Sequence, residues 1–221
     1  MADLKPMTLH SHAAGPNPWK VALILEELGL PYKNEFLDFK QVKQEPFISL
    51  NPNGRVPALE DPNTDITLWE SGAIIDYLVD TYDTANKLQY ASTREKYQTR
   101  VWAHFQMSGQ GPYFGQLIWF SRYHPEKIQS AVDRYASEVR RVTGVIDAHL
   151  KKHKTAYLVG DKVTYADLMF VPWAVAVSSI AGDLLDLSGF DAYDAWMDKL
   201  KGRPSTAKIL KEREAAMAAG H

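Results

Sequence analysis

The hydrophobic pattern of the chain changes near residue 83, and this change constrains the fold more than any other feature. Before that point, short apolar runs typical of strands alternate with segments of helical periodicity. Gly29 follows the first helical segment, at a position where glycine commonly ends a helix. The predicted order is a strand at 7–10, a helix at 19–28, a strand at 32–39, a hairpin at 56–69 and a helix at 71–82. With one short helix allowed before the hairpin, this order predicts a small α/β layer.

After residue 83 the pattern is helical throughout. A polar stretch at 83–95 carries few large apolar residues and is typical of a linker. Beyond it, helical segments are predicted at 93–120, 125–153, 165–180 and 193–201. The sequence therefore predicts an α/β domain at 1–83, a linker at 84–92 and an all-helical domain at 93–221.

Composition excludes several classes of function. The 25 basic residues are balanced by 27 acidic ones, so nothing favours a nucleic-acid partner. Cysteine is absent, which excludes disulfide frameworks, thiolate metal sites and a cysteine nucleophile. The amino terminus lacks the apolar core of a signal peptide, and no uninterrupted apolar run approaches the roughly 18 residues of a membrane span. We therefore expect a cytoplasmic protein with no membrane partner.

The most specific segment is NPNGRVPALED, residues 51–61. Its first half has turn residues, and Val56 and Pro57 then begin a strand. A proline cannot donate to a sheet ladder, so it belongs at a strand start or an edge. If the bond before Pro57 is cis, the N–H and C=O of Val56 face outward and can pair with an extended peptide. An ordinary edge strand after a tight turn explains the same residues.

A second motif, ESGAI at 70–74, lies where the hairpin passes into a helix. Ser71 falls near the helix N-terminus, where free N–H groups and the positive end of the helix dipole favour a carboxylate. Glu70 can pair with an ammonium group. Together they suit the zwitterionic end of an amino-acid-like ligand. The alternative is an N-cap and a first-turn acid without a ligand.

These two motifs together resemble the glutathione site of glutathione transferases. Further blocks are similar to the fungal nitrogen-regulator-like (Ure2p-like) class and its bacterial Nu-class relatives: SHAAGPNPWKVALILEELGLPY, GPYFGQLIWFSRYH, SAVDRYASEVRRV and LVGDKVTYADLMFVPW. The resemblance covers nearly the whole chain. It implies a thioredoxin-like N-terminal domain, a C-terminal helical bundle, a homodimer, and glutathione as a substrate without a metal.

The resemblance also implies which residues bind glutathione. Val56 would pair with the cysteinyl backbone beside a cis Pro57, and Glu70 and Ser71 would hold the γ-glutamyl end. Further contacts are implied for Arg55, for Gln41 or Lys43 in the preceding loop, and for Arg141 at the dimer cleft, next to Arg140.

Asn17 is the residue that the resemblance implies for thiol activation. Other transferase classes place a tyrosine, serine or cysteine after the first strand, but no hydroxyl residue stands between Ser11 and the helix here. The Asn17 side-chain NH₂ could donate to the glutathione sulfur, and the helix N-terminus favours a thiolate. Asn17 could instead be the N-cap of that helix, or serve both purposes.

Two groups in the second half have other roles. Thr164 and Asp167 form a capping-box pattern before an apolar helix, which we interpret as structural. An apolar co-substrate needs a concave apolar wall. For that wall we predict His104, Phe114 and Trp119.

Three functions remain open at this stage. The first is conjugation of the glutathione thiolate to small electrophiles, in detoxification or secondary metabolism. The second is a glutathione-dependent disulfide-bond oxidoreductase or peroxidase, whose site must hold a disulfide or two glutathione molecules. The third is a non-catalytic glutathione-binding regulator. It is the least favoured, because the chain starts almost at the fold, without the Asn-rich extension of the fungal regulator.

Overall fold

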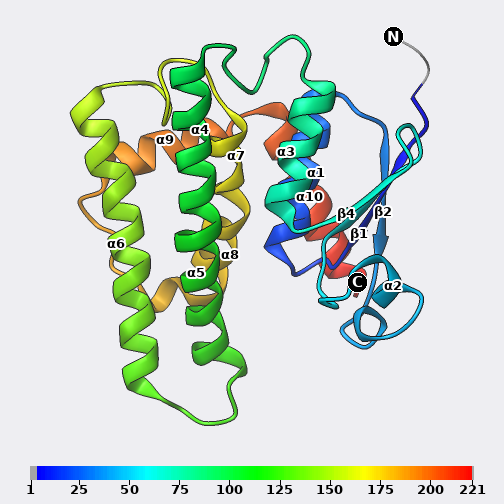
Figure 1. Cartoon of the computed structure of the whole chain (residues 1–221). Coiled ribbons are helices and arrows are strands. Elements are labelled where there is room, and N and C mark those ends of the chain that lie inside the picture. Colours follow the sequence, from blue (N-terminus) through cyan, green and yellow to red (C-terminus); the bar gives the residue numbers. More distant parts are fainter. Residues whose placement is uncertain (1–3, 221) are drawn as a thin grey trace. The chain divides into compact units, whose positions relative to one another are not determined.

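The computed structural model of the chain describes residues 4–220. Contacts separate two compact units: one runs to Lys87 and resumes at Gly202, and the other is Leu88–Lys201. The first unit is built on a four-stranded sheet in the order β2-β1-β3-β4 (Figure 1). Its strands are β1 (Met7–Ser11), β2 (Tyr32–Phe36), β3 (Ala58–Asp61) and β4 (Ile66–Trp69).

The sheet is mixed in direction. β1 pairs parallel to β2 and antiparallel to β3, and β3 pairs antiparallel to β4. The parallel pair requires a crossover, which the first helix supplies, whereas β3 and β4 form a simple hairpin. This is the α/β layer that the sequence predicts.

The helices of the first unit begin and end at recognisable residues. They are α1 (Pro16–Leu28), α2 (Phe47–Leu50), α3 (Ser71–Tyr82) and α10 (Pro204–Ala218), with a 3₁₀ turn, η1, at Gln41–Lys43. Pro16 suits the first helical position, where its missing N–H has no intrahelical partner. Gly29 ends α1 at φ 68°, donating to the Glu26 carbonyl, so the predicted stop is confirmed.

The last helix belongs to the first unit. The sequence places everything after residue 92 in one helical domain, whereas α10 packs against α1 (Figure 1). The physical reason is a buried anchor: Glu27 of α1 receives a two-pronged ion pair from Arg203, just before α10. The boundary after the sheet also lies at Lys87 rather than at residue 83.

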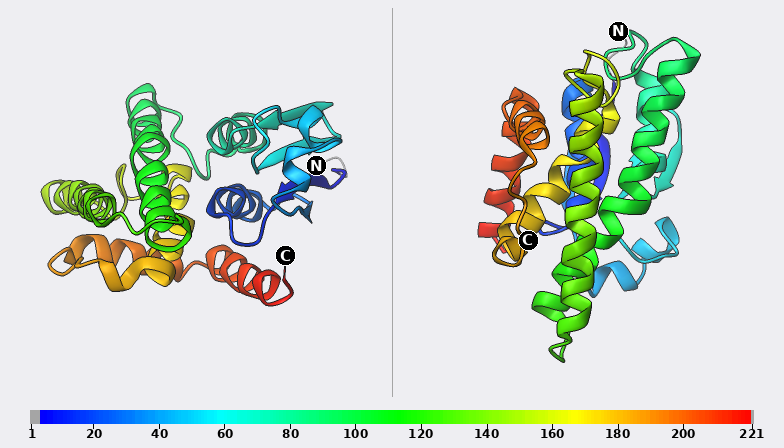
Figure 2. Two further views of the ribbon diagram at one scale, coloured as in Figure 1. Left: turned by 90° about the horizontal axis from the view of Figure 1, so that it is seen from below. Right: turned by 90° about the vertical axis from the view of Figure 1, so that its left-hand side faces the viewer.

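The second unit is all-helical, as predicted. One continuous helical segment, which we call the rod, consists of α4 (Thr93–Phe105), the π-helical η2 (Gln106–Gln110), α5 (Gly111–Ile118) and the π-helical η3 (Trp119–Tyr123). The long helix α6 (Gln129–His153) returns beside it (Figure 2). The bundle is completed by α7 (Tyr165–Met169), α8 (Val171–Ala181), the 3₁₀ turn η4 (Gly182–Leu184) and α9 (Asp191–Lys201).

Small residues let the rod and α8 approach closely. A Cβ at Gly115 would come within 3.1 Å of the Trp173 ring, so glycine lets that ring pack on α5 without any shift of its neighbour. Pro112 lies one position after the start of α5, directly behind the η2 turn. The π-helical segment is wider than an α-helix and accommodates a proline, which offers no N–H to the helix and crowds the carbonyl four residues earlier.

The capping box before α7 is confirmed. The Asp167 carboxylate accepts from the Thr164 N–H at 2.9 Å and from the Thr164 hydroxyl at 2.7 Å. It also accepts from the Leu158 N–H at 2.9 Å and from the Trp196 indole N–H at 3.0 Å. Burial raises the pKa of Asp167 despite these donors. The residue thus joins three segments of the bundle, which is a structural role.

Within residues 4–220, one segment, Tyr165–Leu184, has the length and apolar composition of a membrane-spanning helix. Its apolar window is 61% buried inside the fold. That burial matches the central helix of a bundle, whose apolar residues face its neighbours.

Candidate functional site

Three segments leave the sheet of the first unit where β1 and β4 end and β3 begins, an end of the strands that we call the sheet edge. β3 begins at Ala58, which pairs with Trp69, the last residue of β4, on one side and with His10 of β1 on the other. Because β3 is antiparallel to both neighbours, its start meets their ends. The segments that follow β1, precede β3 and follow β4 carry Asn17, Val56–Pro57 and Glu70–Ser71. Topology therefore brings together the residues that the sequence assigns to one ligand.

The turn before β3 is held by a buried asparagine. The Asn51 amide donates to the Arg55 carbonyl and its oxygen accepts from the Asn53 N–H at 2.9 Å. Gly54 has φ 60°, and a Cβ there would lie 2.8 Å from the Val42 carbonyl oxygen, so glycine is required. Arg55 itself is exposed.

The backbone of Val56 takes no part in the sheet ladder. The Val56–Pro57 bond is cis, as expected from its setting in the sequence. Ladder pairing starts only at Ala58, and no hydrogen bond among the described residues uses the Val56 N–H or C=O. Both groups are therefore placed to pair with an extended peptide.

Glu70 has an unusual backbone. It occupies the N-cap position of α3 at φ 69° and ψ 112°, and its side chain makes no capping hydrogen bond. A non-glycine residue in this region costs about 1–3 kcal/mol, and such strain concentrates at functional sites. Ser71 follows as the first helical residue and is buried. The simple capping interpretation of Glu70 therefore does not account for its carboxylate.

A buried lysine, which sequence reasoning missed, lies near Glu70. Lys20 of α1 is 1% exposed, and burial lowers its pKa to about 7, against the opposing charge of Glu70. It lies three positions after Asn17, so the two share a helix face. The available signal was a lysine inside an otherwise apolar helical run, between Trp19 and Val21.

Asn17 is not the N-cap of α1, so that interpretation is wrong. The N-cap is Gly15, and Asn17 is the second residue of the helix because Pro16 already has helical geometry. The first turn of α1 contains no acidic residue, so the helix dipole there is not offset by a local carboxylate. The preceding turn is fixed by the Trp19 indole N–H, which donates to the Ala13 carbonyl at 2.8 Å.

The loop before α2 carries Gln41 and Lys43, the two alternatives for a ligand contact. The Gln41 side-chain oxygen accepts from the Asp38 N–H at 2.8 Å and so is engaged within its own loop. The Lys43 ammonium lies 3.5 Å from the Asn53 carbonyl, against the turn that leads to Val56. Each side chain thus has a partner within the first unit, and the choice between them stays a prediction.

The remaining predicted residues lie in the second unit. The Arg141 guanidinium donates to the Glu138 carboxylate at 2.8 Å within α6. The adjacent Arg140 guanidinium donates a hydrogen bond to the Asp186 carbonyl. His104 and Trp119 are exposed. Their roles toward a ligand stay predictions.

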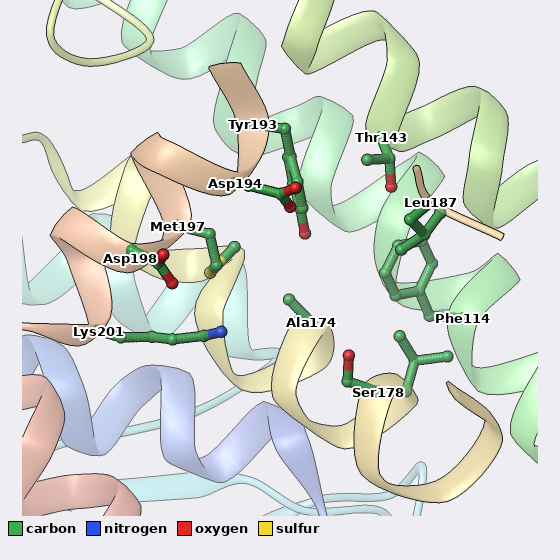
Figure 3. A pocket seen from close by; sticks show the side chains of 11 residues that line it. Phe114, Thr143, Ala174, Ser178, Leu187, Tyr193, Asp194, Met197, Asp198 and Lys201 are labelled. Atoms are coloured by element: carbon green, nitrogen blue, oxygen red, sulfur yellow. The ribbon is translucent and has the colours of Figure 1, made fainter. Parts of the chain in front are cut away.

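Phe114 lines a pocket inside the helical bundle (Figure 3). The pocket has a volume of about 90 Å³, below the roughly 150 Å³ of a cavity that holds benzene. The hydroxyls of Thr143 and Tyr193 point into it (Figure 3). Thr143 is 1% exposed, and its hydroxyl has no hydrogen-bond partner within the described chain. The pocket is too small by itself for an aromatic co-substrate, and neither His104 nor Trp119 lines it.

Over residues 4–220, no group of three His, Asp or Glu side chains is arranged to hold a metal ion. The chemistry available at the sheet edge consists of the backbone polar groups of Val56, the amide of Asn17, the N-terminus of α3, the exposed carboxylate of Glu70 and the buried ammonium of Lys20.

Comparison with known families decides the identity of this arrangement. The model of the glutathione S-transferase N-terminal domain matches residues 5–80, and that of the C-terminal domain matches residues 109–204. The chain belongs to the glutathione S-transferase family. The α/β unit is the thioredoxin-like half of the family fold, and the bundle is its helical half.

This glutathione S-transferase family member has close relatives among fungal proteins. It is 48% identical over 216 residues to the glutathione S-transferase-like protein OpS6 of Beauveria bassiana, covering 97% of this chain and 99% of that one. The glutathione transferase URE2P6 of Phanerochaete chrysosporium, solved with oxidized glutathione, superposes with a TM-score of 0.90 at 46% identity, covering 96% and 98% of the two chains.

The third relative is the transcriptional regulator URE2 of Saccharomyces cerevisiae, 38% identical over 244 residues, covering 94% of this chain and 68% of that protein. Within the glutathione S-transferase family, the chain therefore belongs to the Ure2p-like class.

Proposed function

We propose that the protein binds glutathione at the sheet edge of its first unit and conjugates the thiolate to small electrophiles. The observation that carries this proposal is the convergence of Asn17, Val56–Pro57 and Glu70–Ser71 at one edge. The URE2P6 structure with oxidized glutathione supports the choice of ligand.

Each end of glutathione has a matching group. The unpaired N–H and C=O of Val56 suit the cysteinyl backbone, which would add as a short antiparallel strand. The N-terminus of α3 at Ser71 suits the γ-glutamyl carboxylate. The Glu70 carboxylate, which makes no capping hydrogen bond, suits the ammonium group of the same γ-glutamyl residue. Lys43 and the exposed Arg55 offer positive charge to the glycyl carboxylate.

Thiol activation then falls to Asn17 and the start of α1. Lowering a thiol pKa by roughly 2 units requires about 2.7 kcal/mol. One hydrogen bond to a charged group is worth roughly 1.5–3 kcal/mol, and the helix dipole adds roughly 0.3–1 kcal/mol. Together they supply roughly 1.8–4 kcal/mol, a range that includes the required amount. The thiolate sulfur then bonds to the electrophilic carbon, and the leaving group departs with its electron pair.

Disulfide reduction is the second candidate, because URE2P6 was solved with glutathione in its oxidized form. The same thiolate would attack one sulfur of a disulfide, break the S–S bond and release the other sulfur as a thiolate. A regulator that binds glutathione without turnover is the third, as the name of the URE2 relative indicates for that protein.

Kinetics on the purified protein distinguish the three. Turnover of a chlorinated nitroaromatic with glutathione supports conjugation, whereas turnover of a small disulfide with glutathione supports reduction. Retention on immobilised glutathione without either turnover supports the regulator. Failure to bind glutathione in any form would contradict the proposal as a whole.

We also propose that the protein forms a homodimer. Tyr97 and Val101 are 58% and 63% exposed, one turn apart on α4, and the edge strand β4 exposes Ile66 and Trp69. Each of these two elements exposes apolar side chains, and such exposure marks an interaction surface. Light scattering on a size-exclusion column should give twice the chain mass for the wild type and a lower mass for Val101→Glu.

A further inference from the structure

His12 holds the turn between β1 and α1 in two ways. Its Nδ1 accepts a hydrogen bond from the Ala14 N–H at 3.1 Å, and its carbonyl accepts from the Gly15 N–H at 3.0 Å. Gly15 is the N-cap of α1, two residues before Asn17. The imidazole thus fixes the backbone from which the Asn17 side chain projects.

The same imidazole reaches a second loop. Its ring stacks on Phe39, with ring centroids 4.3 Å apart and an interplanar angle of 29°. Phe39 is 76% exposed, so burial does not explain its position. An offset aromatic pair is favourable beyond its buried area, and His12 supplies the partner ring.

The loop that carries Phe39 is held by its own hydrogen bonds. The Asp38 carboxylate accepts from the N–H groups of Lys40 and Gln41, each at 2.7 Å. The Asp38 N–H in turn donates to the Gln41 side-chain oxygen at 2.8 Å. Two residues further on, Lys43 lies against the turn that leads to Val56. The Lys43 N–H donates to the Lys40 carbonyl at 3.0 Å, so Lys43 and Phe39 belong to one hydrogen-bonded segment.

We propose that His12 is a positioning residue that couples the loop at 38–43 to the thiol-activating turn through its stack on Phe39. Ligand contact at Lys43 would hold Phe39, Phe39 would hold the His12 ring, and Nδ1 would hold the turn before Asn17. The inference rests on the proposed glutathione site, since it assigns a role only if the thiol lies near Asn17.

The coupling requires neutral His12, because a protonated Nδ1 donates and cannot accept from Ala14. Burial lowers the pKa of His12, and the Asp38 charge opposes that shift without cancelling it. Asp38 lies on the same loop as Phe39 and is the charged group whose field acts on the ring. The neutral form is thus favoured at neutral pH, and acidification should loosen the turn.

Three variants separate the hydrogen bond that Nδ1 of His12 accepts from the stack of the His12 ring on Phe39. His12→Ala removes both. His12→Asn keeps an acceptor that can bond the N–H two residues on, as asparagine does in an Asx turn, but removes the stack. Phe39→Ala removes only the stack. His153→Ala, an exposed histidine of α6, is the matched control.

The readouts are the glutathione Kd by calorimetry and the apparent pKa of the bound thiol by thiolate absorbance. His12→Ala should raise the thiol pKa by about one unit, the worth of one hydrogen bond, and His12→Asn should restore most of it. Phe39→Ala should weaken glutathione binding several-fold, and His12→Ala/Phe39→Ala should be less than additive, because both act through one ring.

An unchanged thiol pKa in His12→Ala, or equal effects of His12→Ala and His12→Asn, would overturn the inference. Should His12→Ala not fold, His12→Asn and Phe39→Ala still test it. If the wild type binds and turns over glutathione while these variants match it, only the inference fails. If the wild type does not bind glutathione, the proposed function fails first.

Discussion

Glu27 of α1 and Arg203, 176 residues apart in sequence, form a two-pronged ion pair: Nε donates to one carboxylate oxygen at 2.7 Å and Nη2 to the other at 2.8 Å. Glu27 is 4% exposed, and Ser205 and Lys87 also contact it. This pair fixes the start of α10 on the α/β unit.

Arg203→Met should destabilise the protein by about 2 kcal/mol, because it leaves a buried carboxylate with only part of its partners. Urea unfolding followed by circular dichroism measures the change. Lys208→Met is the control: Lys208 pairs with Glu26 at 2.7 Å, but its side chain is 53% exposed. An exposed pair is worth about 0–1 kcal/mol. Equal losses in the two variants would contradict the assignment of α10 to a buried anchor.

The same carboxylate predicts a pH dependence. Burial alone would raise the pKa of Glu27, but hydrogen bonds from Arg203 and Ser205 and the charges of Arg203 and Lys87 hold that pKa below its ordinary value of 4.5. The unfolded chain therefore takes up the proton first. The stabilisation by Glu27 is complete above the unfolded pKa and is lost as the pH falls through the lower, folded one.

Glu27→Gln should thus be less stable than the wild type at pH 7, and the difference should shrink as the pH falls below 4.5. Unfolding free energies of both proteins, measured from neutral pH to pH 3, provide the check. A constant difference across this range would show that the ionised form of Glu27 contributes nothing.

Glu70 offers a test that separates strain from binding. Glycine tolerates φ 69°, whereas alanine retains the backbone strain without the carboxylate. We expect Glu70→Gly to be more stable than Glu70→Ala by about 1 kcal/mol, while both bind glutathione roughly 10- to 100-fold more weakly than the wild type. Thermal unfolding and calorimetry measure the two effects. Undiminished glutathione binding in both variants would remove Glu70 from the site.

The buried Thr143 hydroxyl predicts a stabilising substitution. Thr99, also buried in a helix, donates to the Glu95 carbonyl one turn earlier at 2.9 Å, whereas Thr143 has no partner within the described chain. Thr143→Val should therefore stabilise by about 1 kcal/mol, and Thr99→Val should destabilise by a similar amount. Denaturant midpoints of the two variants test the contrast, and a loss in Thr143→Val would mean that the hydroxyl is hydrogen-bonded in solution.

Features set by neighbours in sequence could be predicted before the structure. Gly29 ends α1, Thr164 and Asp167 form their box, and Pro57 stands at a strand start because each depends on a few adjacent residues. The order of strands then placed Val56 and Glu70 at one edge.

Features set by packing could not be predicted from the sequence. The apolar residues of α10 form no clear stripe, and its place depends on Arg203 meeting Glu27. Lys20 is an ordinary surface residue type whose burial only the fold reveals. The start of α1 was misjudged because Pro16 adopts helical geometry ahead of Asn17.

That revised position sharpens the test of Asn17. As a residue of the first helical turn, Asn17 lies beside an end of the α1 dipole that carries no acidic side chain. Asn17→Ala should raise the apparent pKa of the bound thiol by about one to two units. The isosteric Asn17→Asp should raise it further, because a carboxylate beside a thiolate disfavours the anion.

Glutathione affinity should change little in either variant, since Val56, Glu70 and Ser71 hold the ligand away from its sulfur. The thiolate absorbance of glutathione-saturated protein, titrated with pH, gives the pKa, and calorimetry gives the affinity. A carboxylate at position 17 should disfavour a nearby thiolate. If Asn17→Asp leaves the thiol titration unchanged, the sulfur does not lie at the start of α1. Activation would then have to come from another group, of which Lys20, one turn further along the same helix face, is the nearest cation in sequence.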